Sequence, residues 1–223
     1  MRSYFRDAGS FAASDAGDVV RVFVVGPIQT NCYAYVSAGE ALVVDPGAAG
    51  ARVAAALAGE KVVCVAATHG HGDHVGGVKA LREATGAKYA ISALDAELAK
   101  HAGEKSELGR SYDDNAPEPD LTLSEGDVLK VGTAEFRVLE APGHTPGGIV
   151  LLGSGSAEHV CFVGDTLFKG SCGRTDLKGG SQETLQRTLA RLKREIPAHT
   201  NVFCGHGDPT TMEDELAQNP YLR

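Results

Sequence analysis

The stretch Thr68-His69-Gly70-His71-Gly72-Asp73-His74 brings histidine and aspartate side chains together between small glycines. Gly70 and Gly72 add no bulk and let the backbone bend round an ion. Imidazole and carboxylate suit zinc, iron or manganese, and the absence of thiolates argues against a purely structural zinc site. In an extended segment, side-chain alternation predicts that His69, His71 and Asp73 point to one side and His74 to the other.

Further candidate ligands follow in short segments that also contain glycine. They are His144 in Pro142-Gly143-His144-Thr145-Pro146-Gly147, Asp165 in Val163-Gly164-Asp165-Thr166, and His206 in Cys204-Gly205-His206-Gly207. Together with the first stretch they offer seven nitrogen and oxygen ligands, enough for two transition-metal ions. The remaining histidines lack such surroundings, and we interpret them as structural or surface residues: His101, His159 and His199.

Composition limits the class of protein. A chain of 223 residues suits one domain, which we place at residues 18–223, after a loose, flexible Ala/Ser/Gly arm at residues 1–17. The net charge of −8 and the pI near 5.5 argue against nucleic acid or an anionic membrane as partner. No apolar run reaches the ~18 residues of a membrane span, and the arm lacks the hydrophobic region of a signal peptide.

The cysteines indicate a reducing environment. They are odd in number and form no Cys-x-x-Cys pair, and Cys32, Cys64 and Cys161 lie in apolar runs where a reduced thiol acts as a small hydrophobic residue. Disulfides are therefore not expected, and a cytoplasmic location is favoured.

The hydrophobic pattern predicts an α/β chain with strands in both halves and helices between them. Expected strands are Val19–Val25, Cys32–Val36, Ala41–Val44, Val62–Ala67, Val128–Val131, Glu135–Glu140, Gly148–Leu152, His159–Val163 and Asn201–Cys204. Expected helices are Ala51–Ala58, Val75–Ala84, Ser92–His101 and Leu185–Arg194, and the polar segment Ser106–Asp120 is expected to be a loop. This order suggests two sheets in contact, covered by helices.

An ordered set of motifs resembles the metallo-β-lactamase superfamily, and within it the small glyoxalase II-like hydrolases. The motifs are Thr30-Asn31-Cys32-Tyr33, Val44-Asp45-Pro46-Gly47, Thr68–Gly77, Ala141–Gly147, Gly164–Phe168, Gly170–Gly180 and Gly205–Thr211. The resemblance covers the chain from about Phe23 to Leu222 and implies a four-layered αβ/βα sandwich with the metals held by loops at one edge.

The resemblance also implies a role for each candidate ligand. One metal would be bound by His69, His71 and His144, and a second by Asp73, His74 and His206, with Asp165 bridging both. The cofactors would be two divalent ions, with zinc expected and iron or manganese as alternatives. Asp45 would orient the histidine loop by hydrogen bonds, or would be a turn residue before Pro46.

The activity implied is hydrolysis of a small-molecule thioester such as a hydroxyacylglutathione. Asp73 and Asp165 would act with a metal-bound hydroxide that attacks the thioester carbonyl. Arg174 would bind a carboxylate of the substrate, or would only pair with Asp176. Longer glyoxalase II enzymes carry tyrosines where Asp176 and Asp208 stand here, and add a helical C-terminal domain.

Two other activities stay open at this point. Persulfide dioxygenases share the sandwich and a Gly-Arg-Thr-Asp segment, found here at Gly173–Asp176. The resemblance to these enzymes implies a single iron ion bound by two histidines and one aspartate. His69, His144 and Asp165 would supply these two imidazoles and the carboxylate. A lactonase or β-lactamase-type hydrolase would use the same two metals with different pocket walls. Neither the sequence pattern nor the charge indicates an oligomeric state.

Overall fold

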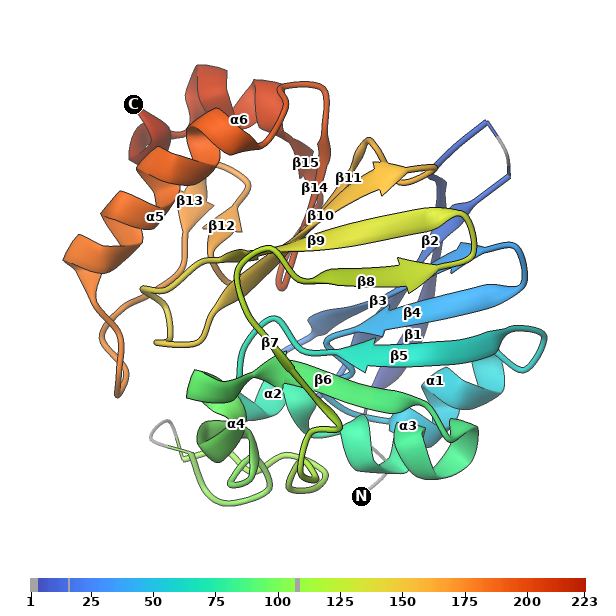
Figure 1. The fold of residues 1–223 in the computed structure, drawn as a ribbon. Helices are drawn as coiled ribbons and strands as arrows, with labels where there is room; N and C mark the ends of the chain where they lie inside the picture. Colours follow the sequence, from blue (N-terminus) through green and yellow to red (C-terminus); the bar gives the residue numbers. More distant parts are fainter. Residues whose placement is uncertain (1–3, 16, 107–108) are drawn as a thin grey trace.

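In the computed structural model, which describes residues 4–15, 17–106 and 109–223, two large sheets pack against each other (Figure 1). The first follows the order β1-β2-β3-β4-β5-β6-β7 and contains β1 (Phe5–Ala12), β2 (Val19–Val25), β3 (Thr30–Ser37), β4 (Glu40–Val44), β5 (Lys61–Ala66), β6 (Lys88–Ser92) and β7 (Leu121–Leu123). The second follows the order β15-β14-β11-β10-β9-β8 and contains β8 (Val128–Val131), β9 (Ala134–Glu140), β10 (Ile149–Gly155), β11 (Val160–Gly164), β14 (Asn201–Cys204) and β15 (Thr210–Thr211).

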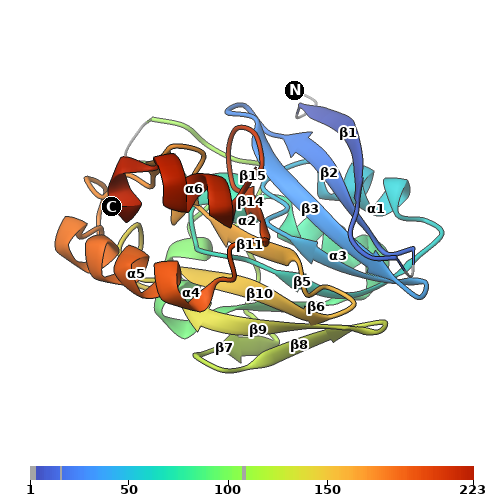
Figure 2. The same ribbon diagram turned by 90° about the horizontal axis from the view of Figure 1, so that it is seen from above.

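Helices lie on the outer faces of both sheets, as the two views in Figures 1 and 2 show. The first sheet is covered by α1 (Gly50–Ala56), α2 (Gly72–Val75), α3 (Val78–Thr85) and α4 (Ala93–Ala99). The second is covered by α5 (Gln182–Glu195), α6 (Met212–Gln218) and the 3₁₀ turn η1 (Pro220–Leu222), and a short hairpin joins β12 (Leu167–Phe168) to β13 (Ser171–Cys172). The order helix, sheet, sheet, helix is the four-layered αβ/βα sandwich that the motifs implied.

Side-chain alternation explains the layers. Along β2, Val20 and Val22 enter the core between the two sheets, whereas Phe23 and Val25 enter the core beneath α1 and α3. Strand β11 behaves in the same way, because Phe162 faces the other sheet and its neighbours pack beneath α5. A strand that is apolar on both faces must be covered on both faces, and this requirement produces a central double sheet.

The N-terminal segment differs from the expected loose arm. Residues Phe5–Ala12 form β1 and pair antiparallel with β2, with a register shift between Asp7 and Gly9. Nearly all of β1 is exposed, so the sequence lacks the apolar alternation that reveals a strand with a buried face. Its backbone hydrogen bonds to β2 hold it. Residues 1–3 and 16 lie outside the described residues.

The helix expected at Val75–Ala84 is divided into α2 and α3. The break falls at Gly76 and Gly77, where the turn after β4 packs against the helical backbone. A Cβ on Gly77 would lie 2.6 Å from the carbonyl oxygen of Pro46. Only glycine allows this approach, and the chain bends here because of it. The helices expected at Ser92–His101 and Leu185–Arg194 are present as α4 and α5.

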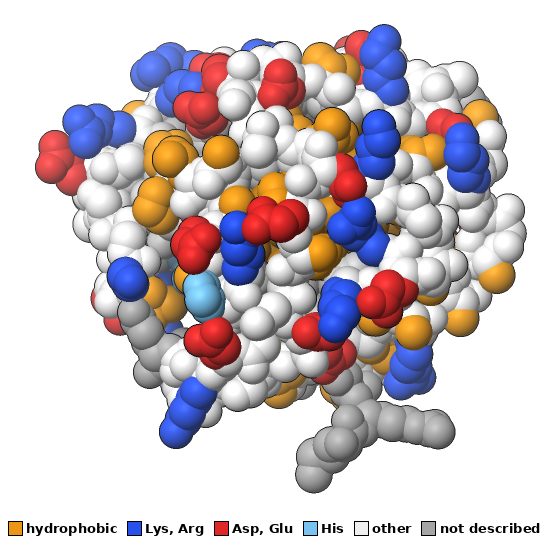
Figure 3. Space-filling model, turned by 60° about the horizontal axis from the view of Figure 1, so that its bottom comes forward, with side chains coloured by type: hydrophobic (Ala, Val, Ile, Leu, Met, Phe, Trp, Pro, Cys, Tyr) orange, Lys and Arg blue, Asp and Glu red, His pale blue; other side chains and the backbone are white. Residues whose placement is uncertain are grey.

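The face over α1, α3 and α4 carries interspersed charges of both signs (Figure 3). Lys79 pairs with Asp114 at 2.8 Å, and Arg82 pairs with Asp120 at the same distance. Among the described residues on this face, acidic side chains thus stand beside basic ones. Among the described residues, no helix combines the length and the apolarity needed to cross a bilayer.

Candidate metal centre

The candidate ligands stand where strands of both sheets end. Strands β4, β5, β6 and β7 run parallel, so Asp45 after β4 and His69 after β5 reach the same edge of the first sheet. In the second sheet β11 and β14 are parallel, so Asp165 and His206 follow their carboxyl ends side by side. His144 follows β9, which runs in the same direction as β11 because both are antiparallel to β10. A shared edge for the carboxyl ends is the usual place for a binding site.

The segment after β5 is not extended to its end. Helix α2 begins at Gly72, with His71 in extended conformation as the residue before it. Asp73 and His74 therefore follow helical geometry, and His74 does not point away as strand alternation predicted. Its Nε2 lies 3.2 Å from Asp73 Oδ2. All four candidate ligands of this segment face the same centre, and the expectation for His74 is corrected.

Three groups of ligand atoms converge at the rim. The groups are His69, His71 and His144; His69, His74 and Asp165; and Asp73, His74 and His206, and within each the ligand atoms lie within 4.8 Å of one another. Segments far apart in the sequence thus supply one cluster that is mostly buried.

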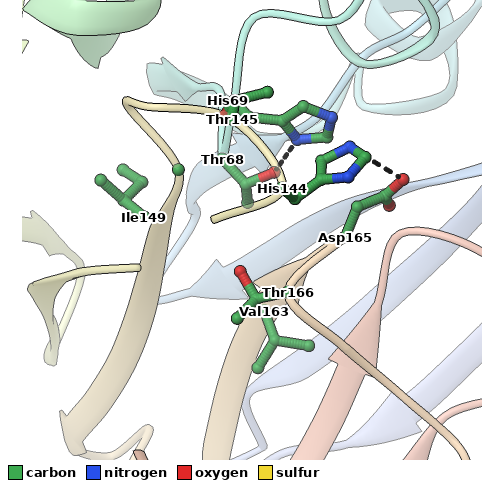
Figure 4. Close-up of a pocket in the computed structure, with 9 residues that line it drawn as sticks. Thr68, His69, His144, Thr145, Ile149, Val163, Asp165 and Thr166 are labelled. Carbon is green, nitrogen blue, oxygen red and sulfur yellow. Dashed lines mark hydrogen bonds and ion pairs between the residues drawn. The ribbon is translucent and has the colours of Figure 1, made fainter. Parts of the chain in front are cut away.

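Asp165 lies between the first and the last of these three groups. Its Oδ1 is 3.3 Å from His74 Nε2, and its Oδ2 is 3.7 Å from His144 Nε2 and 3.5 Å from His206 Nε2. Figure 4 shows its carboxylate directed at the imidazole of His144, with His69 beside them. A single carboxylate that reaches both groups has the position expected of a bridging ligand.

Hydrogen bonds on the ring nitrogens that face away from the centre fix the imidazoles. His69 Nδ1 is 3.1 Å from Thr68 Oγ1 (Figure 4), and His144 Nδ1 is 2.7 Å from the carbonyl oxygen of Arg174. The Nε2 atoms of both histidines are thereby directed inward. The ring of His71 has the opposite orientation. Its Nδ1, and not its Nε2, is the nitrogen directed inward, at 2.9 Å from His144 Nε2. Such outer hydrogen bonds set the tautomer and orientation of metal-binding histidines.

Asp45 makes the hydrogen bonds that the resemblance implied. Its Oδ1 accepts from the Thr68 amide at 2.7 Å, and its Oδ2 accepts from Thr68 Oγ1 at 2.7 Å and lies 2.9 Å from His74 Nδ1. The residue is buried and also occupies the left-handed region at φ 55°. It is therefore both a turn residue before Pro46 and a hydrogen-bond partner of the histidine loop.

The electrostatics of the cluster suit a cation. Burial lowers the pKa of His69 well below its usual value, and burial together with His144 lowers the pKa of His71 to about 4, so both imidazoles are neutral. Burial opposes the charge on His74, but Asp73, Asp165 and Asp45 outweigh it and raise the His74 pKa. Burial likewise opposes ionisation of Asp73 and Asp165, yet His74 lowers the pKa of both.

Buried polar atoms without hydrogen-bond partners provide a test of metal binding. His69 Nε2, His74 Nε2 and Asp165 Oδ1 are buried, and none of them has a hydrogen-bond partner with suitable geometry among the residues that the structure describes. A buried unpaired polar atom costs about 1–3 kcal/mol, and these three all face the centre. Coordination of a divalent cation would satisfy them together. The donor set of imidazole and carboxylate therefore fits divalent metals of the zinc, iron and manganese kind.

Glycine is required where the backbone of one loop touches another. A Cβ on Gly47 would lie 1.4 Å from the carbonyl oxygen of Asp73, and a Cβ on Gly205 would lie 2.2 Å from Asp165 Oδ1. The β4 turn therefore packs directly against the helical turn that carries Asp73 and His74.

Replacing Gly47 with alanine is expected to lower the free energy of unfolding by about 1–3 kcal/mol or more, which is the range for overpacking. The reason is that the added Cβ would force the backbone at Asp73 to move. Chemical denaturation measures the effect. Gly59→Ala is the matched control, since a Cβ there meets no atom of the described residues within 4 Å. Equal stability of the two variants would contradict the predicted contact.

Arg174 pairs with a neighbouring acidic residue. Its guanidinium pairs with Asp176 through Nε to Oδ1 at 2.7 Å and Nη2 to Oδ2 at 2.8 Å, and both side chains are exposed. The hydrogen bond from Arg174 lowers the pKa of Asp176 to about 2. The pairing of Arg174 with Asp176 is therefore present, and binding of a substrate carboxylate by Arg174 stays a prediction. Its carbonyl oxygen, in contrast, holds His144.

Several residues at the centre were not predicted from sequence. Thr30 Oγ1 donates to Asp73 Oδ2 at 3.1 Å, and the ring of Tyr112 packs against Gly72, where a Cβ would lie 2.3 Å from Tyr112 Cδ2. Asn31 and Asp95 bind the backbone of ligand loops. Thr30 and Asn31 lie in one of the motifs that carried the resemblance, and that motif could have indicated that they act near the centre. Tyr112 and Asp95 gave none, because their contacts join segments distant in sequence.

The layered sandwich and the ligand cluster at its rim define a candidate metal-binding protein with the αβ/βα fold. Residues 25–206 match the family described as the metallo-β-lactamase superfamily, and the chain belongs to this superfamily.

Its relatives place it among the glyoxalase II-like metallohydrolases. It is 32% identical over 91% of its length to the hydroxyacylglutathione hydrolase GloC of Haemophilus influenzae, covering 97% of that protein. It is also 43% identical to an uncharacterized protein of Aquifex aeolicus, over 91% of this chain and 96% of that one.

Solved structures agree with the fold. The BLEG-1 B3 metallo-β-lactamase superposes with a TM-score of 0.83 at 32% identity, covering 91% of this chain and 99% of that chain. TTHA1623, solved in a di-iron-bound form, superposes with a TM-score of 0.79 at 33% identity, covering 89% and 98%. Neighbours in this fold thus include a protein that binds two metal ions.

Proposed function

We propose that this protein hydrolyses thioesters of the hydroxyacylglutathione class with two divalent metal ions, of which zinc is the first candidate. The observation that carries the proposal is the pair of three-ligand groups with Asp165 between them. The hydroxyacylglutathione hydrolase among the relatives supports the substrate class. The di-iron form of a neighbour supports the number of ions and leaves iron as an alternative.

Each ligand has a place in this proposal. His69, His71 and His144 would hold the first ion, Asp73, His74 and His206 the second, and Asp165 would contact both. When bound, such ions polarise a carbonyl and lower the pKa of coordinated water to ~7.

The surrounding residues keep the ligands in the required state. Thr30 Oγ1 donates to Asp73 Oδ2 at 3.1 Å and so holds this carboxylate in place. Asp45 occupies His74 Nδ1 and leaves Nε2 directed inward. A thioester suits such a site because its leaving thiol has a pKa near ~8.5 and departs as the thiolate without a strong general acid.

The decisive experiment combines elemental analysis with two activity assays on the purified protein. Two equivalents of metal, together with lactoylglutathione hydrolysis that is lost on chelation and restored by added zinc, would support the proposal. One equivalent of iron with oxygen uptake on glutathione persulfide would contradict it and favour the mononuclear dioxygenase. Cleavage of a β-lactam in place of the thioester would also contradict it.

The pairing of Arg174 with Asp176 leads to a prediction about substrate affinity. Asp176→Ala is expected to lower KM for an anionic glutathione thioester by roughly 2- to 5-fold, the scale of an exposed ion pair, with kcat unchanged. The reason is that Asp176 competes with the substrate carboxylate for the guanidinium. Steady-state kinetics measure this effect, and a thioester of an uncharged thiol is the control. A KM that stays the same or rises for the anionic substrate would contradict the prediction.

A further inference from the structure

Two buried polar side chains hold the ligand loops through backbone groups of those loops, and each serves a different group of ligands. Asp95 lies in the first turn of α4 and is fully buried. Asn31 lies in β3 and is 5% exposed. Neither residue was expected to act at the centre, and both direct their side-chain hydrogen bonds to backbone groups of the ligand loops.

Asp95 ties together the two loops of the first ligand group. Its Oδ2 accepts from the Gly70 amide at 2.9 Å, and its Oδ1 accepts from the Gly147 amide at 2.7 Å. Gly70 stands between His69 and His71, and Gly147 ends the turn that carries His144. A Cβ on Gly147 would lie 2.7 Å from Asp95 Oδ1, so the loop approaches the carboxylate as closely as glycine allows.

Asn31 holds the loop of His206 from both sides. Its Nδ2 donates to the carbonyl oxygens of Cys204 at 3.0 Å and Gly207 at 2.8 Å, and its backbone amide donates to the carbonyl oxygen of Gly205 at 2.8 Å. The neighbouring Thr30 donates to Asp73, another ligand of the same group. This end of β3 therefore orders the second ligand group.

We infer that Asp95 and Asn31 are positioning residues, each setting the metal affinity of one group of ligands. The inference rests on the two-metal site of the proposed function. The loops concerned are rich in glycine, which has the most backbone freedom to lose on ordering. Hydrogen bonds that order them beforehand reduce that loss when the ion binds. Asp95 thus acts on the group of His69, His71 and His144, and Asn31 acts on the group of His206.

Zinc titration in two reference backgrounds tests this division. His206→Ala leaves the first group complete, and His71→Ala leaves the second complete. Asp95→Asn keeps the shape but turns an amide group toward a backbone N–H, and Asn31→Asp turns a carboxylate oxygen toward two carbonyl oxygens. The affinity for Zn²⁺ added to chelator-stripped protein is measured by competition with a chromophoric chelator.

Asp95→Asn is expected to weaken Zn²⁺ binding by about 10–100-fold in the His206→Ala background, the range for outer partners of ligands, and by less than about 2-fold in the His71→Ala background. Asn31→Asp is expected to show the reverse pattern. Equal weakening in both backgrounds, or weakening in neither, would overturn the inference. A residue that only stabilised the fold would affect both backgrounds equally.

Controls keep the result interpretable. Asp120→Asn changes a carboxylate that accepts from the Tyr89 amide at 2.7 Å, away from the centre, and should leave zinc binding unchanged in both backgrounds. If circular dichroism shows that an isosteric variant does not fold, Asp95→Ser and Asn31→Ser replace it with a smaller side chain. No thioester enters the titration, so wild-type protein that binds two equivalents of zinc without cleaving thioesters contradicts only the proposed substrate.

Discussion

Replacing Asp165 with alanine is expected to lower both metal affinity and thioester hydrolysis by more than about 100-fold, and the metal content of the purified protein should fall with the affinity. Outer hydrogen-bond partners of ligands alone account for 10–100-fold in affinity or activity, and Asp165 lies closer to the centre than any of them. Its oxygens reach His74, His144 and His206 within 3.3–3.7 Å. In the proposed centre the substitution would therefore remove a ligand that both ions share.

Elemental analysis and lactoylglutathione kinetics check this outcome, with Asp15→Ala as the control because Asp15 is an exposed residue in the turn between β1 and β2. Asp165→Asn separates charge from shape, since it keeps an oxygen ligand and loses the negative charge. An Asp165→Ala protein that keeps two equivalents of metal would show that this carboxylate does not contact the ions.

Replacing Asp45 with alanine is expected to have the second largest effect, on stability as well as on activity. The change leaves the Thr68 amide, the Thr68 hydroxyl and His74 Nδ1 without their buried acceptor. Removing a buried, charged hydrogen-bond partner in this way lowers the free energy of unfolding by about 3–5 kcal/mol. Metal affinity should also fall by about 10–100-fold, because His74 loses the bond that orients it.

Denaturant unfolding of the metal-free protein and zinc titration of the same sample separate these two effects of Asp45→Ala. Asp45→Asn is the informative companion, because it keeps one oxygen acceptor and should fall between the wild type and the alanine variant. A metal-free alanine variant as stable as the wild type would contradict the role of the three hydrogen bonds.

The sequence predicted the parts of this protein whose signal is local. Strand β2 has the predicted bounds, because Val19–Val25 alternates between two buried faces. The ligands could be predicted because histidine and aspartate beside glycine form short motifs that are typical of metal sites. The division of the Val75–Ala84 helix was missed, since the break depends on Pro46, a residue of another element.

Contacts between distant segments could not be predicted from local pattern. Asp95 resembles an ordinary acidic residue in the first turn of a helix, and nothing near it in sequence identifies Gly70 and Gly147 as its partners. The exposed strand β1 was missed for a related reason, since its partner β2 supplies the hydrogen bonds while its own side chains lack a buried face.

The division of the ligands between the two sheets has a consequence for the newly made chain. His206 follows Asp73 by 133 residues, so the segment Thr68–His74 leaves the ribosome long before its last partner. The first half can fold its sheet and collect some of its imidazoles, but the complete set exists only once the loop after β14 has been synthesised. A nascent chain that stops before His206 therefore lacks the full centre, and the proposed hydrolysis would begin only after that loop has joined the others.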